Sequence, residues 1–592
     1  MAGRAHQRRP AMSRLRLALV GVVALSTLTV AVNASTPHGV VEAAPRQIDI
    51  FAPGPLGAVT VFGDSVLLGS ALWGPTLPER LAERGWGPIK FRAGEGYNTR
   101  TGKFGARTWL SNWRTQGWDA PNVLINLGAN DSGICDTNIN CVRQRIQGVI
   151  DEIGPGHTIW WPQITRLFTA LPQQNTWNQA LREFANTRND FFTWDWPAEL
   201  SQYRSSDGTH LTPDGYRTRS VRMANLFTRD VARAQQTGDP APLPTPTADP
   251  ATFVSIPGVR VIDTRVDDGA GPLTPGETRA VDFGDIPPEN ASAVALYVGA
   301  AKTQSNGYFV AGPCGLATSG STVNYRPFTA IGAPTIVALG EDDDVCVYSS
   351  GTADLVIDIQ GAFVDGPEGM TFHPLATPER LVDTRETGRS SEVVVPTPAG
   401  ARAVAVNLTA VRAQQRGFIS AYPCGEPGGT ANLNFRPGPA WSASAIVNVS
   451  DADTICVSSN VSTDVIVDIT GTFGNGAGLR YVPVPPTRML DTRDGTGGWS
   501  PMQGAGQTIG TRVAPPSARA VTGTITMVRP LERGYVTADA CSGSARTSSA
   551  NAAAGAVIAN SMTLGISDTG QLCLRASSTG QTLFDTTGWW VP

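Results

Sequence analysis

The second half of the chain contains a threefold internal repeat. Three cysteine pairs are each separated by 32 residues, and an asparagine lies ten residues after each first cysteine. An Asp-Thr-Arg triplet precedes each pair, and an apolar-Asp-x-x-Gly segment follows it. Intervals that recur in this way indicate one structural unit used three times, so the fold must accommodate three copies of a small domain. The copies span residues 253–364, 371–474 and 480–591.

Each copy is predicted to be an all-β domain, most simply a sandwich. Runs such as 403–408 and 465–469 are rich in apolar and β-branched residues, and no long helical period occurs in this half. An even number of cysteines at regular spacing is typical of disulfides in an exported protein. A zinc site is disfavoured because no histidine lies near any of the pairs. The expected bridges are Cys135–Cys141, Cys314–Cys346, Cys424–Cys456 and Cys541–Cys573.

Residues 55–235 have a different pattern, in which strand and helix signals alternate. Apolar runs at 58–62, 123–127, 158–161 and 191–194 are separated by helical stretches, including one that ends near residue 84 and others at 142–153, 178–187 and 213–235. Such alternation predicts an α/β domain whose parallel sheet is covered on both faces and binds ligands at the carboxyl ends of its strands. Residues 236–250 follow as a proline-rich linker.

The N-terminus predicts export. Arginines precede an apolar run at 17–32 that ends in small residues, so residues 1–34 are predicted to be a signal peptide and the protein to be secreted, with wall association open. An uncleaved anchor is the alternative, but the run is shorter than the ~20 residues that a span needs. Without this segment 41 basic side chains face 50 acidic ones. An acidic chain with no basic run argues against nucleic acid as a partner.

Three short motifs in the α/β region carry groups that suit acyl transfer. Ser65 follows a predicted strand and begins a helix, Asn130 follows the next run, and Asp207 stands three residues before His210. A serine needs a base to take its proton, and the base needs a carboxylate to orient it. Each motif also has a structural interpretation: a helix cap at Ser65, a turn at Asn130 and a solvated turn at 207–210.

Together the blocks GDSV at 63–66, GAND at 128–131 and DGTH at 207–210 resemble the SGNH (GDSL-type) hydrolase family. The resemblance implies a three-layer, flavodoxin-like α/β fold with a parallel sheet and no cofactor or metal. It implies that Ser65 is the nucleophile, His210 the general base and then acid, and Asp207 the orienting carboxylate. The oxyanion hole would consist of the Ser65 N–H, Asn130 and a glycine. Gly94 and Gly96 both fit the glycine block, and Gly96 is preferred.

A softer resemblance, at Trp177-Asn178 and Asp195-Trp196, is to SGNH domains that accompany O-acyltransferases of surface polysaccharides. The predicted function is therefore a secreted serine esterase that removes acyl groups, most simply acetyl, from a glycan. An O-acyltransferase, a lipase or lysophospholipase, and a wall protein with a vestigial hydrolase domain are the alternatives. Tryptophans such as Trp109, Trp113 and Trp118 could stack on sugars, although a core role is favoured.

The repeats resemble modules of secreted actinobacterial proteins and hold no catalytic set. Spacer, wall-attachment and polysaccharide-binding roles all stay open for them. The Asp-Thr-Arg triplets at 263–265, 383–385 and 491–493 are predicted to be buried turns or ion pairs rather than ligand sites. The acidic run 341–344 lacks the ligand spacing of a calcium loop.

Overall fold

The computed structural model describes residues 45–166, 168–266, 271–316, 320–426 and 430–592. The predicted signal peptide at 1–34 lies outside these residues. Within them, no helix combines the length and the apolar character that a membrane crossing requires.

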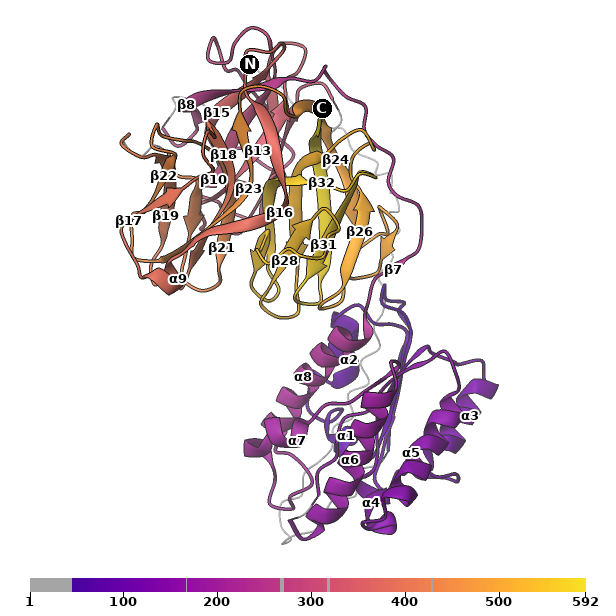
Figure 1. The fold of residues 1–592 in the computed structure, drawn as a ribbon. Coiled ribbons are helices and arrows are strands. Elements are labelled where there is room, and N and C mark those ends of the chain that lie inside the picture. Colours follow the sequence, from indigo (N-terminus) through magenta and orange to yellow (C-terminus); the bar gives the residue numbers. More distant parts are fainter. Residues whose placement is uncertain (1–44, 167, 267–270, 317–319, 427–429) are drawn as a thin grey trace, which may run out of the picture. The chain divides into compact units, whose positions relative to one another are not determined.

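The first part of the described chain is a three-layer α/β fold around a six-stranded sheet, as predicted (Figure 1). The strand order is β1-β3-β2-β4-β5-β6; β2 to β6 run parallel, and β1 pairs antiparallel with β3 at one edge. The strands are β1 (Arg46–Ile50), β2 (Val59–Gly63), β3 (Ile89–Ala93), β4 (Asn122–Asn126), β5 (Thr158–Trp160) and β6 (Phe191–Phe192).

Successive residues of the central strands alternate between the two faces of this sheet, and each face is covered by helices. Phe62 and Ile125 belong to a core shared with α3 (Ala106–Thr115), α5 (Ile139–Ile153) and α6 (Leu171–Thr187). On the opposite face Trp160 packs edge-on against Phe227 of α8 (Pro213–Val231). The remaining helices are α1 (Ser65–Gly69), α2 (Leu77–Glu83), α4 (Ala129–Cys135) and α7 (Trp196–Glu199), with 3₁₀ turns at Phe168–Ala170 and Ser201–Tyr203.

Several boundaries differ from the sequence-based expectations. The helix expected to run to about residue 84 is two short helices, α1 and α2, and α8 stops at Val231 instead of continuing to 235. Strands β1 and β3 and helix α3 were not predicted at all. Strand β3 alternates buried apolar residues with Lys90 and Arg92, which is a strand pattern that continuous apolar runs alone do not reveal.

The second part of the chain is all-β, and the three repeats share one topology. Each has two four-stranded antiparallel sheets, ordered β13-β10-β15-β8 and β12-β11-β14-β9 in the first repeat and equivalently in the others. The first repeat contains β8 (Thr252–Asp263), β9 (Thr278–Val281), β10 (Ala291–Ala301), β11 (Gly307–Pro313), β12 (Val323–Tyr325), β13 (Ile331–Ala338), β14 (Val345–Ser349) and β15 (Asp354–Val364).

The other two repeats follow the same plan. The second contains β16 (Thr371–Asp383), α9 (Thr384–Thr387), β17 (Glu392–Pro396), β18 (Ala403–Val411), β19 (Gly417–Pro423), β20 (Leu433–Phe435), β21 (Trp441–Asn448), β22 (Thr454–Ser459) and β23 (Asp464–Gly474). The third contains β24 (Arg480–Asp491), β26 (Thr508–Arg512), β27 (Ala520–Val528), β28 (Gly534–Asp539), β29 (Ala550–Ala552), β30 (Val557–Gly565), β31 (Gln571–Ala576) and β32 (Gln581–Val591). It also has a short strand β25 (Trp499–Ser500), which pairs with β7 (Gln235–Gln236).

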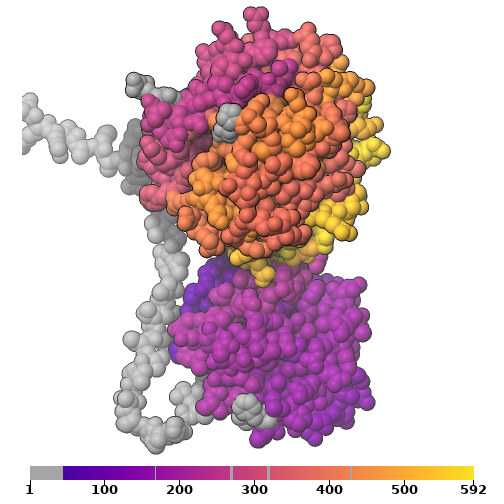
Figure 2. Space-filling view, turned by 60° about the vertical axis from the view of Figure 1, so that its left-hand side comes forward, coloured from indigo at the N-terminus to yellow at the C-terminus, as the bar shows by residue number. Residues whose placement is uncertain are grey.

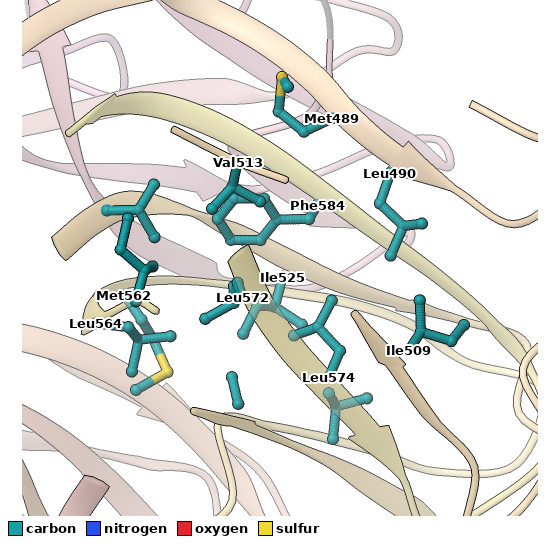
Figure 3. Packing of buried hydrophobic residues seen from close by; sticks show 14 of the residues in the cluster. Met489, Leu490, Ile509, Val513, Ile525, Met562, Leu564, Leu572, Leu574 and Phe584 are labelled. Atoms are coloured by element: carbon teal, nitrogen blue, oxygen red, sulfur yellow. The ribbon is translucent and has the colours of Figure 1, made fainter. Parts of the chain in front are cut away.

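The two sheets of a repeat pack face to face over one apolar core. In the third repeat Phe584 of β32 and Ile525 of β27 meet Leu572 and Leu574 of β31 (Figure 3). The first sheets of all three repeats also share a second core, which includes Phe363, Phe473 and Trp590. The sheets are therefore arranged like propeller blades around a common centre, and the repeats adjoin in the space-filling view (Figure 2). Whether the repeats pack together was left open by the sequence, and this core shows that they do.

Buried charge networks recur at the Asp-Thr-Arg triplets, as the sequence analysis favoured. In the second repeat Arg380 Nε lies 2.8 Å from Oδ1 of buried Asp468, and its Nη1 lies 3.2 Å from Asp383, which also pairs with Arg385. The equivalent networks centre on Arg260 and Arg488. All four expected disulfides are present.

Candidate active site

The carboxyl ends of the parallel strands bring the motif residues together. Ser65 follows β2 and is the first residue of α1, while Gly96 lies in the loop after β3. Asn130 lies in the first turn of α4, directly after β4. The 205–211 loop, which leads into α8, supplies Asp207 and His210. Four separate connections therefore converge at one edge of the sheet, where open α/β folds place their ligands.

A chain of hydrogen bonds links the serine, the histidine and the aspartate. Ser65 Oγ lies 2.9 Å from His210 Nε2, and His210 Nδ1 lies 2.5 Å from Asp207 Oδ2. With the Nδ1 proton donated to the carboxylate, Nε2 has a free lone pair and accepts from the serine hydroxyl. This is the arrangement in which an imidazole can remove the serine proton.

The 205–211 loop keeps Asp207 ionised. Burial alone would raise the pKa of Asp207, but hydrogen bonds from the His210 N–H and ring, the Ser205 hydroxyl and the Thr209 N–H outweigh it. These donors hold the pKa of this carboxyl well below its usual range. A carboxylate that stays charged orients the imidazole and stabilises the imidazolium that forms when the serine is deprotonated.

A contact between Gly69 and Tyr216 positions the helix that carries Ser65 relative to the helix that follows His210. Gly69 ends α1, and a Cβ atom added there would lie only 2.1 Å from the ring of Tyr216, which is in the first turns of α8. Only glycine lets α1 and α8 approach this closely. Ser65 begins one of these helices and His210 lies three residues before the other, so the contact restricts their separation.

The three predicted oxyanion donors lie on the connections that follow β2, β3 and β4. The Ser65 N–H lies at the start of α1, where helix geometry leaves it without an intrahelical partner. Gly94 donates its N–H to Gly63 O at 3.2 Å, whereas the Gly96 N–H has no hydrogen-bond partner among the described residues. Asn130 Nδ2 donates to Tyr97 O at 2.8 Å, which leaves its second hydrogen available. Between the two candidate glycines, this geometry favours Gly96.

The asparagine block is held by residues on both sides of it. Buried Asp131 accepts hydrogen bonds from the N–H and hydroxyl of Thr99, which tie the loop after β3 to α4. Gly128 adopts a φ of 125°, and a Cβ there would lie 2.3 Å from the Trp177 ring. Trp177 therefore presses against the backbone just before Asn130, so it supports the site from within the core.

Beneath Ser65 lies a buried polar network that the sequence analysis did not predict. Asp64 caps α1 by accepting from Val66 N at 3.0 Å, and it also accepts from Asn126 Nδ2 at 3.2 Å. Arg219 of α8 is fully buried and donates to Asn126 Oδ1. Burial raises the pKa of Asp64 to about 6, and its Oδ2 has no hydrogen-bond partner. An arginine within a helix is ordinarily expected on its exposed face, so the helical periodicity did not predict that Arg219 is buried.

The tryptophans are mainly core residues, as favoured. Trp113 of α3 is buried in the core, and Trp109 and Trp118 are partly buried against that core. Trp196 is buried beside the Arg219 guanidinium, which lies 4.4 Å from its ring centroid. The Cys135–Cys141 bridge joins the end of α4 to the start of α5, next to the Asn130 turn.

Comparison with known proteins gives a match for this part of the chain. Residues 61–218 match the model of the GDSL-like Lipase/Acylhydrolase family, a range that includes Ser65, Gly96, Asn130, Asp207 and His210. No curated protein matches the chain.

Solved structures with similarity cover a comparable share of the chain. A lipolytic G-D-S-L family protein from Veillonella parvula is 18% identical, with a TM-score of 0.25 over 29% of this chain and 98% of that one. The catalytic domain of peptidoglycan O-acetyltransferase A from Streptococcus pneumoniae is 16% identical (TM-score 0.24; 30% and 98%). A carbohydrate acetylesterase from Sinorhizobium meliloti is 14% identical (TM-score 0.23; 28% and 97%).

The family match covers most of the described α/β fold and includes every residue of the Ser65–His210–Asp207 chain. The α/β part of the chain is therefore similar to GDSL-like lipases and acylhydrolases over residues 61–218, and the protein is an ester hydrolase.

Proposed function

We propose that the protein is a secreted serine esterase that removes short acyl groups, acetyl in particular, from a glycan. The observation that carries this proposal is the continuous hydrogen-bond chain from Ser65 through His210 to Asp207. The four disulfides among the described residues suit an oxidising compartment outside the cytosol.

The first half of the reaction acylates the serine. Ser65 Oγ attacks the acyl carbonyl carbon while His210 Nε2 takes the hydroxyl proton. The carbonyl oxygen becomes an oxyanion, which the N–H groups of Ser65 and Gly96 and the amide of Asn130 stabilise. His210 then gives its proton to the departing alcohol oxygen as the bond from carbon to that oxygen breaks, and the acyl group stays on Ser65.

The second half releases the acid. His210 Nε2 takes a proton from water, whose oxygen attacks the acyl carbon. The second tetrahedral intermediate collapses, Ser65 recovers its proton from His210, and the carboxylic acid departs. Asp207 stays ionised throughout and holds the imidazole in one tautomer.

The surroundings of Ser65 favour a bulky, polar alcohol and a short acyl group. The His210 and Asp207 side chains are 37% and 49% exposed, so a polymer can reach the base directly. The groups that this proposal assigns to the reaction are small or polar, namely Gly96, Asn130 and the Asp207–His210 pair. A site for long acyl chains would need an apolar channel in their place.

The test is a panel of p-nitrophenyl esters from acetate to octanoate, assayed with the full chain, together with acetate release from an acetylated polysaccharide. We expect acetate to be the preferred ester and Ser65→Ala to lower kcat/KM by about 10⁴-fold or more. Ser201→Ala, a change to an exposed serine outside the site, is the matched control and should keep the wild-type rate.

Wild-type turnover by Ser65→Ala would refute the role of the serine, and a preference for octanoate would refute the short-acyl proposal. Product analysis in the presence of a neutral oligosaccharide separates hydrolysis from transfer. Free acetate as the main product supports the esterase, whereas acetylated oligosaccharide would make the enzyme an acyltransferase with the same serine.

A further inference from the structure

A cavity of about 510 Å³ lies where the three repeats meet, outside the α/β domain. Equivalent segments of the repeats line it: the connections from β12 to β13, from β20 to β21 and from β29 to β30. Its volume falls in the range of ordinary ligand sites. Since no single repeat encloses this space, the cavity exists only because the repeats pack around a common centre.

The charge of this cavity is one-sided. Arg326, Arg416 and Arg436 line it, and its lining holds no acidic side chain. Among the described residues, none of these arginines forms an ion pair, although Arg326 Nη2 donates to Gly555 O at 3.0 Å. Burial lowers the pKa of Arg436, and the nearby charges of Arg326 and Arg416 lower it further. Three guanidinium groups close enough to repel one another favour an anion between them.

The third repeat leaves room for such an anion. Twelve residues after the first cysteine, the first two repeats carry Arg326 and Arg436, whereas the third carries Ala553. Ala554 and Ala556 continue this small stretch of the lining. The departure from threefold symmetry therefore opens space opposite two of the arginines.

An aromatic residue occupies a position where glycine is expected. Fourteen residues after the first cysteine, all three repeats adopt a positive φ: 59° at Phe328, 118° at Gly438 and 68° at Gly555. Glycine adopts this conformation freely, whereas a phenylalanine is strained there. Phe328 is also 82% exposed and lines the cavity, so folding gains little from its ring. A strained and exposed aromatic side chain indicates contact with a ligand.

Hydrogen-bond acceptors complete the lining. Asn324, Asn434 and Asn551 occupy the same position in the three repeats, and each donates its amide hydrogens to neighbouring hydroxyl groups. None of their three side-chain oxygens accepts a hydrogen bond from a described residue. A ligand with several hydroxyl donors matches these oxygens, which a bare inorganic anion does not.

We infer that this cavity binds an anionic saccharide. The arginines hold its carboxylate or phosphate, the asparagine oxygens accept from its hydroxyl groups, and Phe328 and Phe418 cover the apolar face of a sugar ring. The three sets of groups are those that a charged, polyhydroxylated ring requires. This site goes beyond the proposed esterase activity and does not depend on it.

The test is calorimetric titration of the full chain with trigalacturonate and with glucose 6-phosphate, which distinguish a carboxylate from a phosphate. Neutral galactotriose, inorganic phosphate and adenosine monophosphate are the comparison ligands. We expect at least one anionic sugar to bind saturably, and each comparison ligand to bind about tenfold more weakly or worse. The Ser65→Ala protein should bind as the wild type does, which separates this site from the esterase.

Matched variants locate the site. Arg416→Ala should weaken binding about tenfold or more, whereas Arg533→Ala should not, because Arg533 has the same repeat position but does not line the cavity. Phe328→Gly should weaken binding while the unfolding midpoint stays the same or rises, because glycine relieves the strain.

Three outcomes would overturn the inference. The first is the absence of binding by both anionic sugars. The second is equally tight binding of neutral sugar, inorganic phosphate or nucleotide. The third is an equal loss of binding in the Arg416 and Arg533 variants.

Discussion

Both halves of the molecule pair an aspartate with a basic side chain three residues away, and the two pairs have different roles. In the α/β domain Asp207 meets His210, and both side chains are more than one-third exposed. In the second repeat Arg380 meets Asp383, which is 4% exposed, and also the nearly inaccessible Asp468. Histidine exchanges a proton near neutral pH, whereas arginine does not. The comparison shows that the titratable partner and its access to solvent, rather than the spacing, suit one pair to catalysis.

The largest effect is expected from removing the titratable partner. His210→Gln takes away the base but leaves a hydrogen-bonding side chain of similar size, so kcat/KM for p-nitrophenyl acetate should fall by about 10⁴-fold or more. The thermal unfolding midpoint should stay close to that of the wild type because the pair is exposed. A loss of folding in parallel with activity would mean that this pair, too, is structural.

Removing Arg380 from its ion-pair network should have the opposite effect, a loss of stability with no change in activity. Arg380→Ala leaves the Asp468 carboxylate buried without its partner, which should lower the free energy of unfolding by about 3 kcal/mol. Esterase activity of the folded protein should not change. The double variant Arg380→Met/Asp468→Leu removes both charges and should recover most of the loss in urea unfolding. A double variant as unstable as the single one would argue against an electrostatic cause.

A third prediction concerns Asp64. Burial raises the pKa of this carboxyl to about 6 from an ordinary value near 4. A raised pKa means that the folded state binds the proton more tightly, so this group stabilises the fold at low pH. That stabilisation, about 3 kcal/mol, is lost as the pH rises through 6. Asp64→Asn keeps the acceptor for Val66 N but removes the charge, so it should abolish this loss.

The measurement is urea unfolding of both proteins at pH 4 and pH 7, with hydrogen exchange in peptides of β2 and α1 as the local readout. The wild type should lose stability in these elements between the two pH values, and the variant should not. The same loss in both proteins would assign the pH dependence to another group.

The smallest effect is expected at the Cys135–Cys141 bridge. It spans a sequence separation of six, and closing so short a loop restricts the unfolded chain by about 2 kcal/mol. The Cys135→Ser/Cys141→Ser variant should therefore lose about that much stability while it keeps the Asn130 turn and most of its activity. A loss of activity far larger than the loss of stability would give the bridge a role in holding Asn130.

The sequence predicted the residues of the candidate site better than the residues that support them. Ser65, Asn130, Asp207 and His210 could be proposed from short local motifs, and the structure brings Ser65, Asp207 and His210 into one hydrogen-bond chain. The motifs preferred Gly96 but left Gly94 open, because the distinction depends on a hydrogen bond from Gly94 to Gly63 between neighbouring strand ends. Buried Arg219 was missed for a related reason, since its partners Ser70 and Asn126 lie 149 and 93 residues away in the sequence.

The repeats show the same division. Their number, their disulfides and their two-sheet character follow from intervals along the chain. The common aromatic core with Phe363, Phe473 and Trp590 could not be predicted, because packing between repeats produces no sequence pattern within a single repeat. The cavity lined by three arginines depends on that packing, so it could not be predicted from the sequence either.

The central claim is that the exposed Asp207–His210 pair activates Ser65, whereas the buried aspartate–arginine pairs only stabilise the fold of each repeat. Stoichiometric labelling with a fluorophosphonate, followed by peptide mass spectrometry, tests this claim most directly. The account predicts one phosphonate per chain, on Ser65, with a labelling rate that falls about 10²-fold or more in His210→Gln and stays at the wild-type value in Arg380→Ala. Labelling at another serine, or undiminished labelling of Ser65 in His210→Gln, would contradict it.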